Sequence, residues 1–358
     1  MAGTSATPNG WTTSDILLNA PRFLIVGPAW VGDMVMAQAL FRHLAGRYHG
    51  AVIDVLAPGW TFPLLSRMPE VRRAIEMPLG HGQLGLGVRR RLGRSLRSEG
   101  YDRAICLPIT WKSALVPFHA RIPRRSGFLG EQRWFLLNDI RSLKKAPATM
   151  AARYVWLGLE RGEILTDPLP HPRLRVDAEA RDATLARLGL SGEPPVLALC
   201  PGAEYGPAKR WPATHFAAVA RQWLTERGGQ VWIFGGEKDH EIGAAIVEEA
   251  PGVVNLAGRT SLTEAIDLLS LSEVVVSNDS GLMHVAAALD RPLVAVYGSS
   301  TPDYTPPLTQ RAEIVSLGLS CSPCFRRECP QGHTRCLNEL PPAWVWNALN
   351  TVRSPCRP

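Results

Sequence analysis

A short polar turn near residue 278 carries the residue types that bind phosphate. It follows residues 274–276, a β-branched apolar run typical of a buried strand, and it precedes apolar residues at helical spacing. The turn consists of three N-cap types and a glycine: Asn278, Asp279, Ser280 and Gly281. Free amides at a helix start bind anions, and a glycine lets a phosphate approach them. The turn therefore predicts a diphosphate site, although a capped helix packed on a sheet fits the local pattern equally well.

Two further side chains could act on a bound substrate. His284 lies one turn into the expected helix, where its imidazole could donate to a diphosphate or simply be a satisfied core group. Asp33 follows the turn of residues 27–34 (GPAWVGDM), at the start of another expected helix. A carboxylate there could act as a general base or only complement the helix dipole. The turn has neither the Walker lysine nor three dinucleotide glycines, which disfavours NTPase and dehydrogenase functions.

Strands and helices alternate around these residues. We expect strands at residues 23–26, 51–56, 103–107, 196–200, 231–234, 253–255, 274–276 and 293–297. We expect helices at residues 33–47, 64–68, 178–188, 213–227, 238–249 and 262–271. The rhythm is interrupted once, by a stretch rich in proline, aspartate and arginine. This pattern predicts an α/β fold with two Rossmann-like, doubly wound domains that face a cleft.

The interruption and the two ends of the chain define the expected domain organisation. We expect a loosely ordered extension at residues 1–20, domains at 21–175 and 195–340, a hinge at 176–194 and a C-terminal helix and tail at 341–358. A length of 358 residues with 46% hydrophobic content is enough for two cores. Neither a membrane-spanning run nor a signal-peptide pattern is seen, which predicts a cytoplasmic protein.

The formal net charge of +7 is concentrated in the first half. One expected helix carries Arg89, Arg90, Arg91, Arg94 and Arg97, and the basic residues Arg121, Arg124, Arg125, Arg133, Arg141, Lys144 and Lys145 follow. This clustering predicts an anionic substrate, a phosphorylated lipid headgroup or a membrane surface, unless it is only a solvated face. No RNA- or DNA-binding motif accompanies it, so we expect no nucleic-acid partner.

Five separated motifs resemble the bacterial lipopolysaccharide heptosyltransferases, inverting glycosyltransferases of the GT-B fold. They are residues 27–34, 66–71 (SRMPEV), 77–82 (MPLGHG), 200–212 (CPGAEYGPAKRWP) and 278–289 (NDSGLMHVAAAL). The resemblance implies transfer of L-glycero-D-manno-heptose from ADP-heptose to the first heptose of heptosyl-Kdo2-lipid A, at the cytoplasmic surface of the inner membrane. It implies no cofactor and no catalytic metal ion. By analogy with many GT-B enzymes, a C-terminal helix at about residues 343–351 would cross back to the first domain.

The resemblance also implies individual roles. Asp33 would be the general base, and Lys209 would neutralise the departing diphosphate. Five residues would bind the donor: Glu237, Asp279, Ser280, Gly281 and His284. Four would contact the acceptor: Trp30, Lys112, Arg125 and Arg133. The sequence of residues 30–34 (WVGDM) favours the enzyme that adds the second heptose of the inner core. The alternatives are the first heptosyltransferase, or a non-catalytic protein that binds nucleotides or anionic glycans.

Seven cysteines are present, and four of them cluster within sixteen residues: Cys321, Cys324, Cys329 and Cys336, with His333 nearby. This spacing could hold a structural zinc ion, but the second pair is wider than the usual knuckle. Reduced thiols or a stress-formed disulfide are the alternatives. Cys106 and Cys200 lie in apolar runs and are expected in the core. Cys356, close to the C-terminus, has no expected role.

Overall fold

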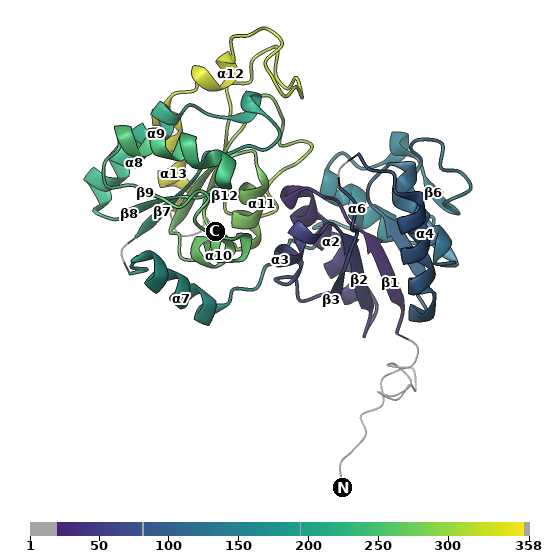
Figure 1. Cartoon of the computed structure of the whole chain (residues 1–358). Helices are drawn as coiled ribbons and strands as arrows, with labels where there is room; N and C mark the ends of the chain where they lie inside the picture. The colour runs from purple at the N-terminus through teal and green to yellow at the C-terminus, as the bar shows by residue number, and fades with distance from the viewer. Residues whose placement is uncertain (1–19, 81, 194, 354–358) are drawn as a thin grey trace. The chain divides into compact units, whose positions relative to one another are not determined.

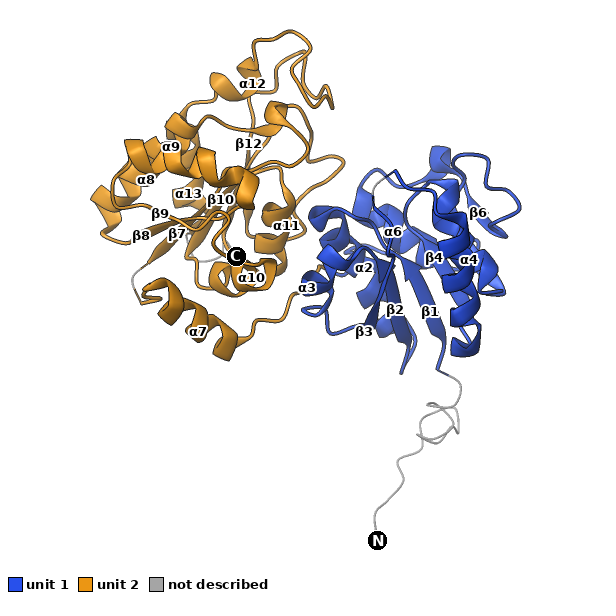
Figure 2. Cartoon of the chain, in the orientation of Figure 1, with its two compact units in different colours: residues 1–170 blue, residues 171–358 orange. Residues whose placement is uncertain are grey.

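The structure is a computed structural model that describes residues 20–80, 82–193 and 195–353. The chain divides into two compact units, residues 1–170 and 171–358, which have different colours in Figure 2. Except for Ala20, the predicted N-terminal extension lies outside the described residues.

Unit 1 is built on six parallel strands in the order β3-β2-β1-β4-β5-β6. The strands are β1 (Arg22–Val26), β2 (Val52–Ala57), β3 (Val71–Glu76), β4 (Arg103–Cys106), β5 (Arg124–Phe128) and β6 (Asp139–Arg141). The helices are α2 (Val31–Arg47), α3 (Phe62–Leu65), α4 (Leu86–Ser95), α5 (Leu115–His119) and α6 (Met150–Gly158). Short 3-10 helices lie between them: η1 (Gly59–Thr61), η2 (Leu96–Glu99), η3 (Trp111–Ala114) and η4 (Leu143–Lys145).

Hydrophobic burial explains why these segments form a sheet with helices on it. Four consecutive residues of β1 are buried, as expected for a strand covered on both faces. α2 packs against α6, and its buried residues include Met34, Leu40 and Phe41. These contacts fix the start of α2, and with it Asp33, at the carboxyl edge of the sheet.

Unit 2 repeats the same strand order with its own strands, β12-β11-β10-β7-β8-β9, all parallel (Figure 1). The strands are β7 (Val196–Cys200), β8 (Gln230–Ile233), β9 (Val254–Asn255), β10 (Val274–Asn278), β11 (Leu293–Val296) and β12 (Ala312–Val315). The helices are α7 (Ala178–Leu188), α8 (Ala213–Arg227), α9 (His240–Glu249), α10 (Leu262–Leu269), α11 (Gly281–Ala288), α12 (Arg335–Asn338) and α13 (Pro342–Arg353). Two 3-10 helices, η5 (Pro207–Lys209) and η6 (Glu237–Asp239), follow β7 and β8.

The strand order of unit 2 locates its binding edge. The chain runs from β7 outward to β8 and β9 on one side, and from β10 outward to β11 and β12 on the other. The connections after the neighbouring strands β7 and β10 therefore diverge, and open α/β sheets bind ligands at the carboxyl ends of the strands at such a switch point. Lys209 follows β7 and Asp279 follows β10, so both fall at this position.

Two segments of the expected organisation belong to unit 2. The predicted hinge, residues 176–194, contains α7, which packs against α10, and Arg187 pairs with Glu264 at 2.7 Å. The expected C-terminal helix is α13, which packs on β10, β11, β12 and α8, with Val345, Trp346 and Leu349 in the core of unit 2.

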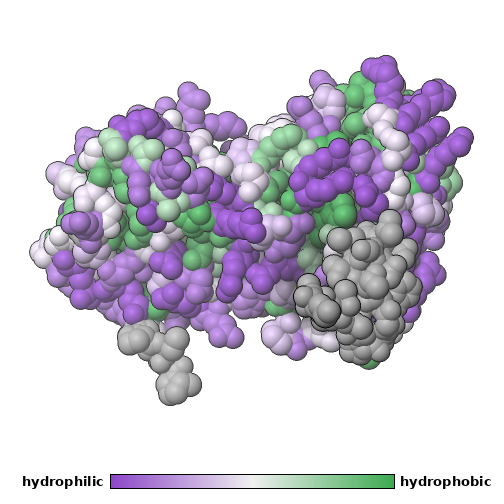
Figure 3. Space-filling view, turned by 90° about the horizontal axis from the view of Figure 1, so that it is seen from below, coloured by the Kyte–Doolittle hydropathy of each residue, from purple (hydrophilic) through white to green (hydrophobic). Residues whose placement is uncertain are grey.

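Hydrophilic side chains cover much of the surface that Figure 3 shows, with hydrophobic patches between them. Across residues 20–80, 82–193 and 195–353, no helix is long and apolar enough to cross a membrane.

Candidate functional site

An ion pair joins the loops that follow β7 and β10. Lys209, the last residue of η5, places Nζ 2.5 Å from Oδ2 of Asp279. Ser300, in the loop after β11, donates its hydroxyl to the same oxygen at 2.5 Å. Asp279 is only 5% exposed, so its carboxylate holds the ammonium of Lys209 at the sheet edge rather than in open solvent. Sequence reasoning missed Ser300, although its place after the strand next to β10 was a usable signal.

Asn278 fixes the backbone of both loops. This fully buried last residue of β10 accepts from the backbone N–H of Trp211 at 3.1 Å and donates Nδ2 to the carbonyl of Pro201 at 2.6 Å. Pro201 and Trp211 lie on either side of the Lys209 loop. The side chain of Trp211 is itself buried and donates to the carbonyl of Leu340 at 3.1 Å. One amide side chain therefore sets the position of the loop that carries the cation.

His284 is buried in α11, and its pKa is affected by the charges of both residues of this ion pair. The pKa of His284 is lowered to about 4, mainly by burial; the negative charge of Asp279 opposes this shift, and the positive charge of Lys209 adds to it. The imidazole is neutral at pH 7, so it presents one N–H donor and one acceptor. Ser280 is the N-cap of α11, but its side chain makes no capping hydrogen bond to the helix. Its hydroxyl lies 3.3 Å from that of Ser277, and Gly281 begins the helix beside it.

Two further residues border the Lys209 loop. The ring of Tyr205 lies near two cations, with Lys209 Nζ at 5.3 Å and Arg327 Cζ at 5.6 Å from its centroid. Sequence reasoning missed Tyr205, because the cations approach it from different segments. Glu237 is exposed in η6 after β8, where Lys238 and Glu204 pair at 2.9 Å. The structure therefore places Glu237 on the same edge of the sheet, one strand away from β7.

Unit 1 positions the predicted base at its own switch point. Asp33 is half-buried in the first turn of α2, after β1, and Trp30 is 43% exposed at the N-cap of this helix. The indole of Trp60 donates to the carbonyl of Ala29 at 3.0 Å, which holds the turn between β1 and α2. Lys112 follows β4, the strand next to β1, and is half-buried in η3. Trp30, Asp33 and Lys112 thus share one edge of the first sheet.

The other two predicted acceptor contacts are structural in character. Arg133 is fully buried and donates to the carbonyls of Phe128, Pro108 and Thr110 and to the hydroxyl of Ser113. Its guanidinium faces the protein interior and holds these loops together, and a contact with the acceptor stays a prediction. Arg125 is half-buried and donates to two backbone carbonyls, those of Leu136 and Ile122.

The predicted basic helix is also corrected in one position. Arg89 is buried and donates to the carbonyls of Leu84, Lys112 and Gln83, so it does not belong to the solvent-facing cluster. Four arginines remain exposed on α4 and η2, namely Arg90, Arg91, Arg94 and Arg97. The pKa of Arg97 is lowered by partial desolvation and by the charges of Arg121, Arg94 and Arg90. This coupling means that these positive charges lie close together.

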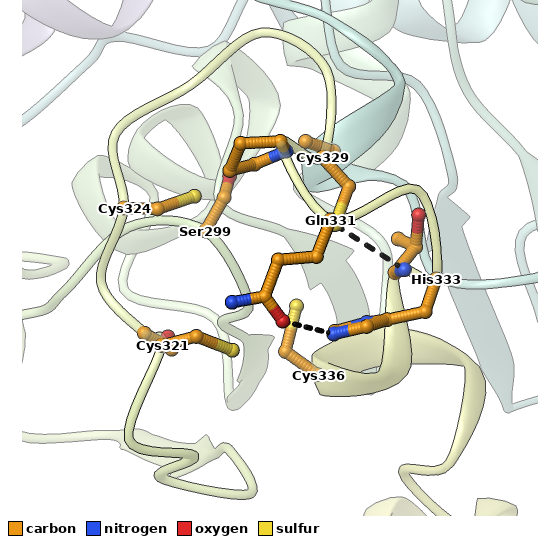
Figure 4. A pocket seen from close by; sticks show the side chains of 11 residues that line it. Ser299, Cys321, Cys324, Cys329, Gln331, His333 and Cys336 are labelled. Carbon is orange, nitrogen blue, oxygen red and sulfur yellow. Dashed lines mark hydrogen bonds between the residues drawn. The ribbon is translucent and has the colours of Figure 1, made fainter.

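The four clustered cysteines line one pocket, together with Ser299, Gln331 and His333 (Figure 4). All four thiols are free. Hydrogen bonds from backbone N–H groups, the largest from Thr334, lower the pKa of Cys329. Burial raises the pKa of Cys336, and the other three cysteines raise it further. Among the described residues, no group of three or more His, Cys, Asp or Glu side chains is arranged so that it could hold a metal ion.

Cys106 and Cys200 are buried in β4 and β7, as predicted for core residues. Burial raises the pKa of Cys106 to about 11 and moves that of Cys200 in the same direction. Neither thiol is suited to act as a nucleophile at neutral pH. Cys356 lies outside the described residues.

Known proteins resemble this chain along most of its length. The model of glycosyltransferase family 9 (heptosyltransferase) matches residues 89–335. Lipopolysaccharide heptosyltransferase 2 of Escherichia coli (strain K12) is 48% identical over 92% of this chain and 98% of the relative. Lipooligosaccharide heptosyltransferase 2 of Haemophilus influenzae is 50% identical over 82% of this chain and 88% of the relative.

The fold comparison agrees with the sequence comparison. The solved structure of E. coli ADP-heptose lps heptosyltransferase II has a TM-score of 0.83 and 46% identity, with 93% of this chain and 98% of that chain covered. The two Rossmann-like domains are those of the GT-B fold, and the protein is a glycosyltransferase. With a family match over more than half of its length and close relatives over nearly all of it, the chain belongs to glycosyltransferase family 9, the heptosyltransferases.

Proposed function

We propose that this glycosyltransferase moves L-glycero-D-manno-heptose from ADP-heptose to the first heptose of heptosyl-Kdo2-lipid A, with inversion at the transferred carbon. The observation that carries the proposal is the group of Lys209, Asp279 and His284 at the switch point of unit 2. It combines an anchored ammonium with a neutral imidazole and a helix start, which suits a nucleoside diphosphate.

The proposed mechanism is a direct displacement. Asp33 takes a proton from the attacking hydroxyl of the acceptor, and the new bond forms as the bond to ADP breaks on the opposite face. Lys209 neutralises the charge that develops on the departing diphosphate. The amides at the start of α11 and the N–H of His284 donate to the same group, with Ser280 and Gly281 at the turn. Glu237 accepts from the ribose or adenine. A cation and donors of this kind can replace a catalytic metal ion.

The test measures ADP release with ADP-heptose and lipid A core acceptors that carry either no heptose or one. The proposal expects turnover only with the one-heptose acceptor, and a fall of roughly 10²- to 10⁴-fold for Asp33→Ala. Asp33→Asn removes the basicity with little change in volume and is expected to behave alike. Turnover only with the heptose-free acceptor would identify the first heptosyltransferase instead. ADP-heptose binding without ADP release on either acceptor would favour a non-catalytic binding protein.

A metal-independent reaction is part of the proposal and has its own control. We expect the rate to be unchanged after a brief addition of EDTA, with the metal content of the protein measured afterwards. A rate that falls with EDTA and returns with Mg²⁺ would contradict this part, because a phosphate-bound Mg²⁺ would then share the role of Lys209.

We further propose that unit 1 associates with the cytoplasmic surface of the inner membrane through the exposed arginines of α4 and η2. Clustered arginines attract anionic lipid headgroups by roughly 1 kcal/mol for each charge near the surface. The support is that Arg90, Arg94 and Arg97 are all exposed and that neighbouring arginines lower the pKa of Arg97. Flotation with vesicles that contain about one third anionic lipid tests it. Arg90→Glu with Arg94→Glu should abolish binding, whereas Lys238→Glu in unit 2 should not.

A further inference from the structure

The cysteine pocket lies in an irregular segment that relies on few regular backbone contacts. Between the end of β12 at Val315 and the start of α12 at Arg335, the chain forms turns and bends but no helix or strand. Most of its side chains are exposed or half-buried. Irregular segments of this length are uncommon in compact domains and are usually either functional or disordered. The segment contains three of the four thiols, and the fourth, Cys336, follows at the start of α12.

The backbone that follows Cys329 turns back and forms hydrogen bonds with this residue, including one with its sulfur. The N–H of Gly332 donates to the carbonyl of Cys329 at 3.0 Å, which closes a turn, and Gly332 has a φ of 72°. The N–H of Thr334 donates to the Cys329 sulfur itself at 3.4 Å. Amide donors directed at a sulfur stabilise the thiolate form, and thiolate is the form that binds metal ions. This hydrogen bond is independent of the spacing of the cysteines in the sequence.

The four side chains reach one pocket from two directions. Cys321 and Cys324 come from a turn in which Ser322 donates to the carbonyl of Gly298, and Figure 4 shows Cys329 and Cys336 on the opposite wall. As the described side chains stand, no three of them form a group that could hold a metal ion, so a bound ion requires the cysteine side chains to turn. Rotation about a single χ1 torsion moves each sulfur between staggered positions without any change in the backbone. We propose that these four thiolates bind one Zn²⁺ ion in a tetrahedral structural site.

Zinc is the ion that fits this chemistry. Four thiolates form a closed tetrahedral set, without an open position for substrate, as structural zinc sites require. Soft sulfur ligands select zinc over magnesium or calcium, which prefer oxygen. A divalent cation would also offset the repulsion between neighbouring thiolates. His333 lines the pocket, but its Nδ1 accepts from the backbone N–H of Arg335 and its Nε2 lies 2.6 Å from Gln331 Oε1, so it stays outside the ligand set.

The zinc-bound segment would support the loop that carries Lys209. The N–H of Ala208 donates to the carbonyl of Arg327 at 3.1 Å, and the hydroxyl of Tyr205 donates to that of Phe325 at 2.7 Å. The N–H of Phe325 in turn donates to the carbonyl of Ser299, next to the Ser300 that holds Asp279. Zinc loss should therefore weaken ADP binding as well as the fold. This consequence rests on the proposed function, whereas the zinc site itself does not.

The first experiment is elemental analysis of the whole protein, purified under reducing conditions without added chelator. We expect one Zn²⁺ per chain in the wild type and in the control Cys356→Ser, and almost none in Cys321→Ser with Cys336→Ser. Iron in the same ratio would overturn the assignment of zinc. Protein without metal that also fails to bind Zn²⁺ or Co²⁺ on reconstitution would overturn the site. Bound Co²⁺ should show thiolate charge-transfer absorption and the visible bands of tetrahedral geometry.

A second measurement uses only the wild type, so it stands even where a cysteine variant fails to fold. The thiol reagent DTNB is added to the native protein before and after a strong zinc chelator. We expect the chelator to release Zn²⁺ and to expose four additional fast-reacting thiols. Equal reactivity in both samples would contradict the proposal. Stripped protein should bind ADP roughly tenfold more weakly. Unchanged ADP affinity after complete zinc loss would refute the coupling to the Lys209 loop, and the zinc measurement would be unaffected.

Discussion

Lys209 and Asp279 form an ion pair across the switch point of the second sheet, with Nζ and Oδ2 2.5 Å apart although the residues are 70 positions apart in the sequence. The carboxylate is buried and also accepts from Ser300, so it cannot turn away without losing both donors. The pair keeps an ammonium pointing at the carboxyl edge of the strands before a substrate arrives. A charged group that is already in position before the reaction stabilises a charged leaving group most effectively, because no reorganisation is needed during the reaction.

Removal of the ammonium should slow the reaction more than it weakens donor binding. We expect Lys209→Met to lower kcat by about 10²- to 10³-fold, because Lys209 interacts most strongly with charge that develops during displacement. Asp279→Asn should have a smaller effect. The double variant should lose less than the sum of the two, since the residues contact each other. Steady-state kinetics test this, with Lys238→Met as a lysine control in the same unit. Simple additivity would contradict a functional pair.

His284 should make the stability of the protein depend on pH. Its pKa in the folded protein is about 4, below the ordinary value of 6.5, so the unfolded chain binds more protons between these two pH values. Stability therefore rises as pH increases through this window and is lost as pH falls through it, by up to about 3 kcal/mol. Urea unfolding at pH 7 and pH 5 measures the slope. His284→Asn should flatten it, and an equally steep slope in the variant would refute the assignment.

Gly206 has no room for a side chain. A Cβ at this position would lie 2.5 Å from the backbone carbonyl oxygen of Arg327, which cannot move without disturbing the cysteine-rich segment. We expect Gly206→Ala to cost about 1 to 3 kcal/mol in stability and to raise the KM for the donor. Gly46→Ala is the control, since a Cβ there meets nothing within 4 Å and alanine favours the helix. Chemical unfolding and kinetics of both variants decide the matter. Equal stability of the two would be the contrary result.

Arg133 should matter for folding rather than for acceptor binding. Arg133→Met leaves the carbonyls of Phe128, Pro108 and Thr110 without this buried donor, and we expect a loss of about 3 kcal/mol in the free energy of unfolding. The exposed Arg91→Met should change stability by less than about 0.5 kcal/mol. The KM for the acceptor is measured where Arg133→Met is folded. A higher KM at unchanged stability would restore Arg133 as an acceptor contact.

Several elements could be predicted from the sequence because local periodicity specifies them. The observed bounds of β7, α7 and α8 are those predicted, at residues 196–200, 178–188 and 213–227. Other elements lacked such a signal. β3 carries charged residues at its exposed positions, β5 contains two arginines and a glycine, and β6 has only three residues. These segments are strands because they pair with neighbouring strands of the sheet, and the periodicity of the sequence gives no information about that pairing.

The sequence by itself determined the strand, turn and helix around Asn278, and the residue types there that are suited to bind a diphosphate. It also determined two repeats of the same α/β rhythm, because apolar spacing is a local property. Only the tertiary structure decided that Ser300 joins Asp279 and that Arg89 and Arg133 are buried. These outcomes depend on strand order and on side-chain packing between distant segments. From the sequence alone, an arginine that faces solvent cannot be distinguished from one that donates to buried carbonyls.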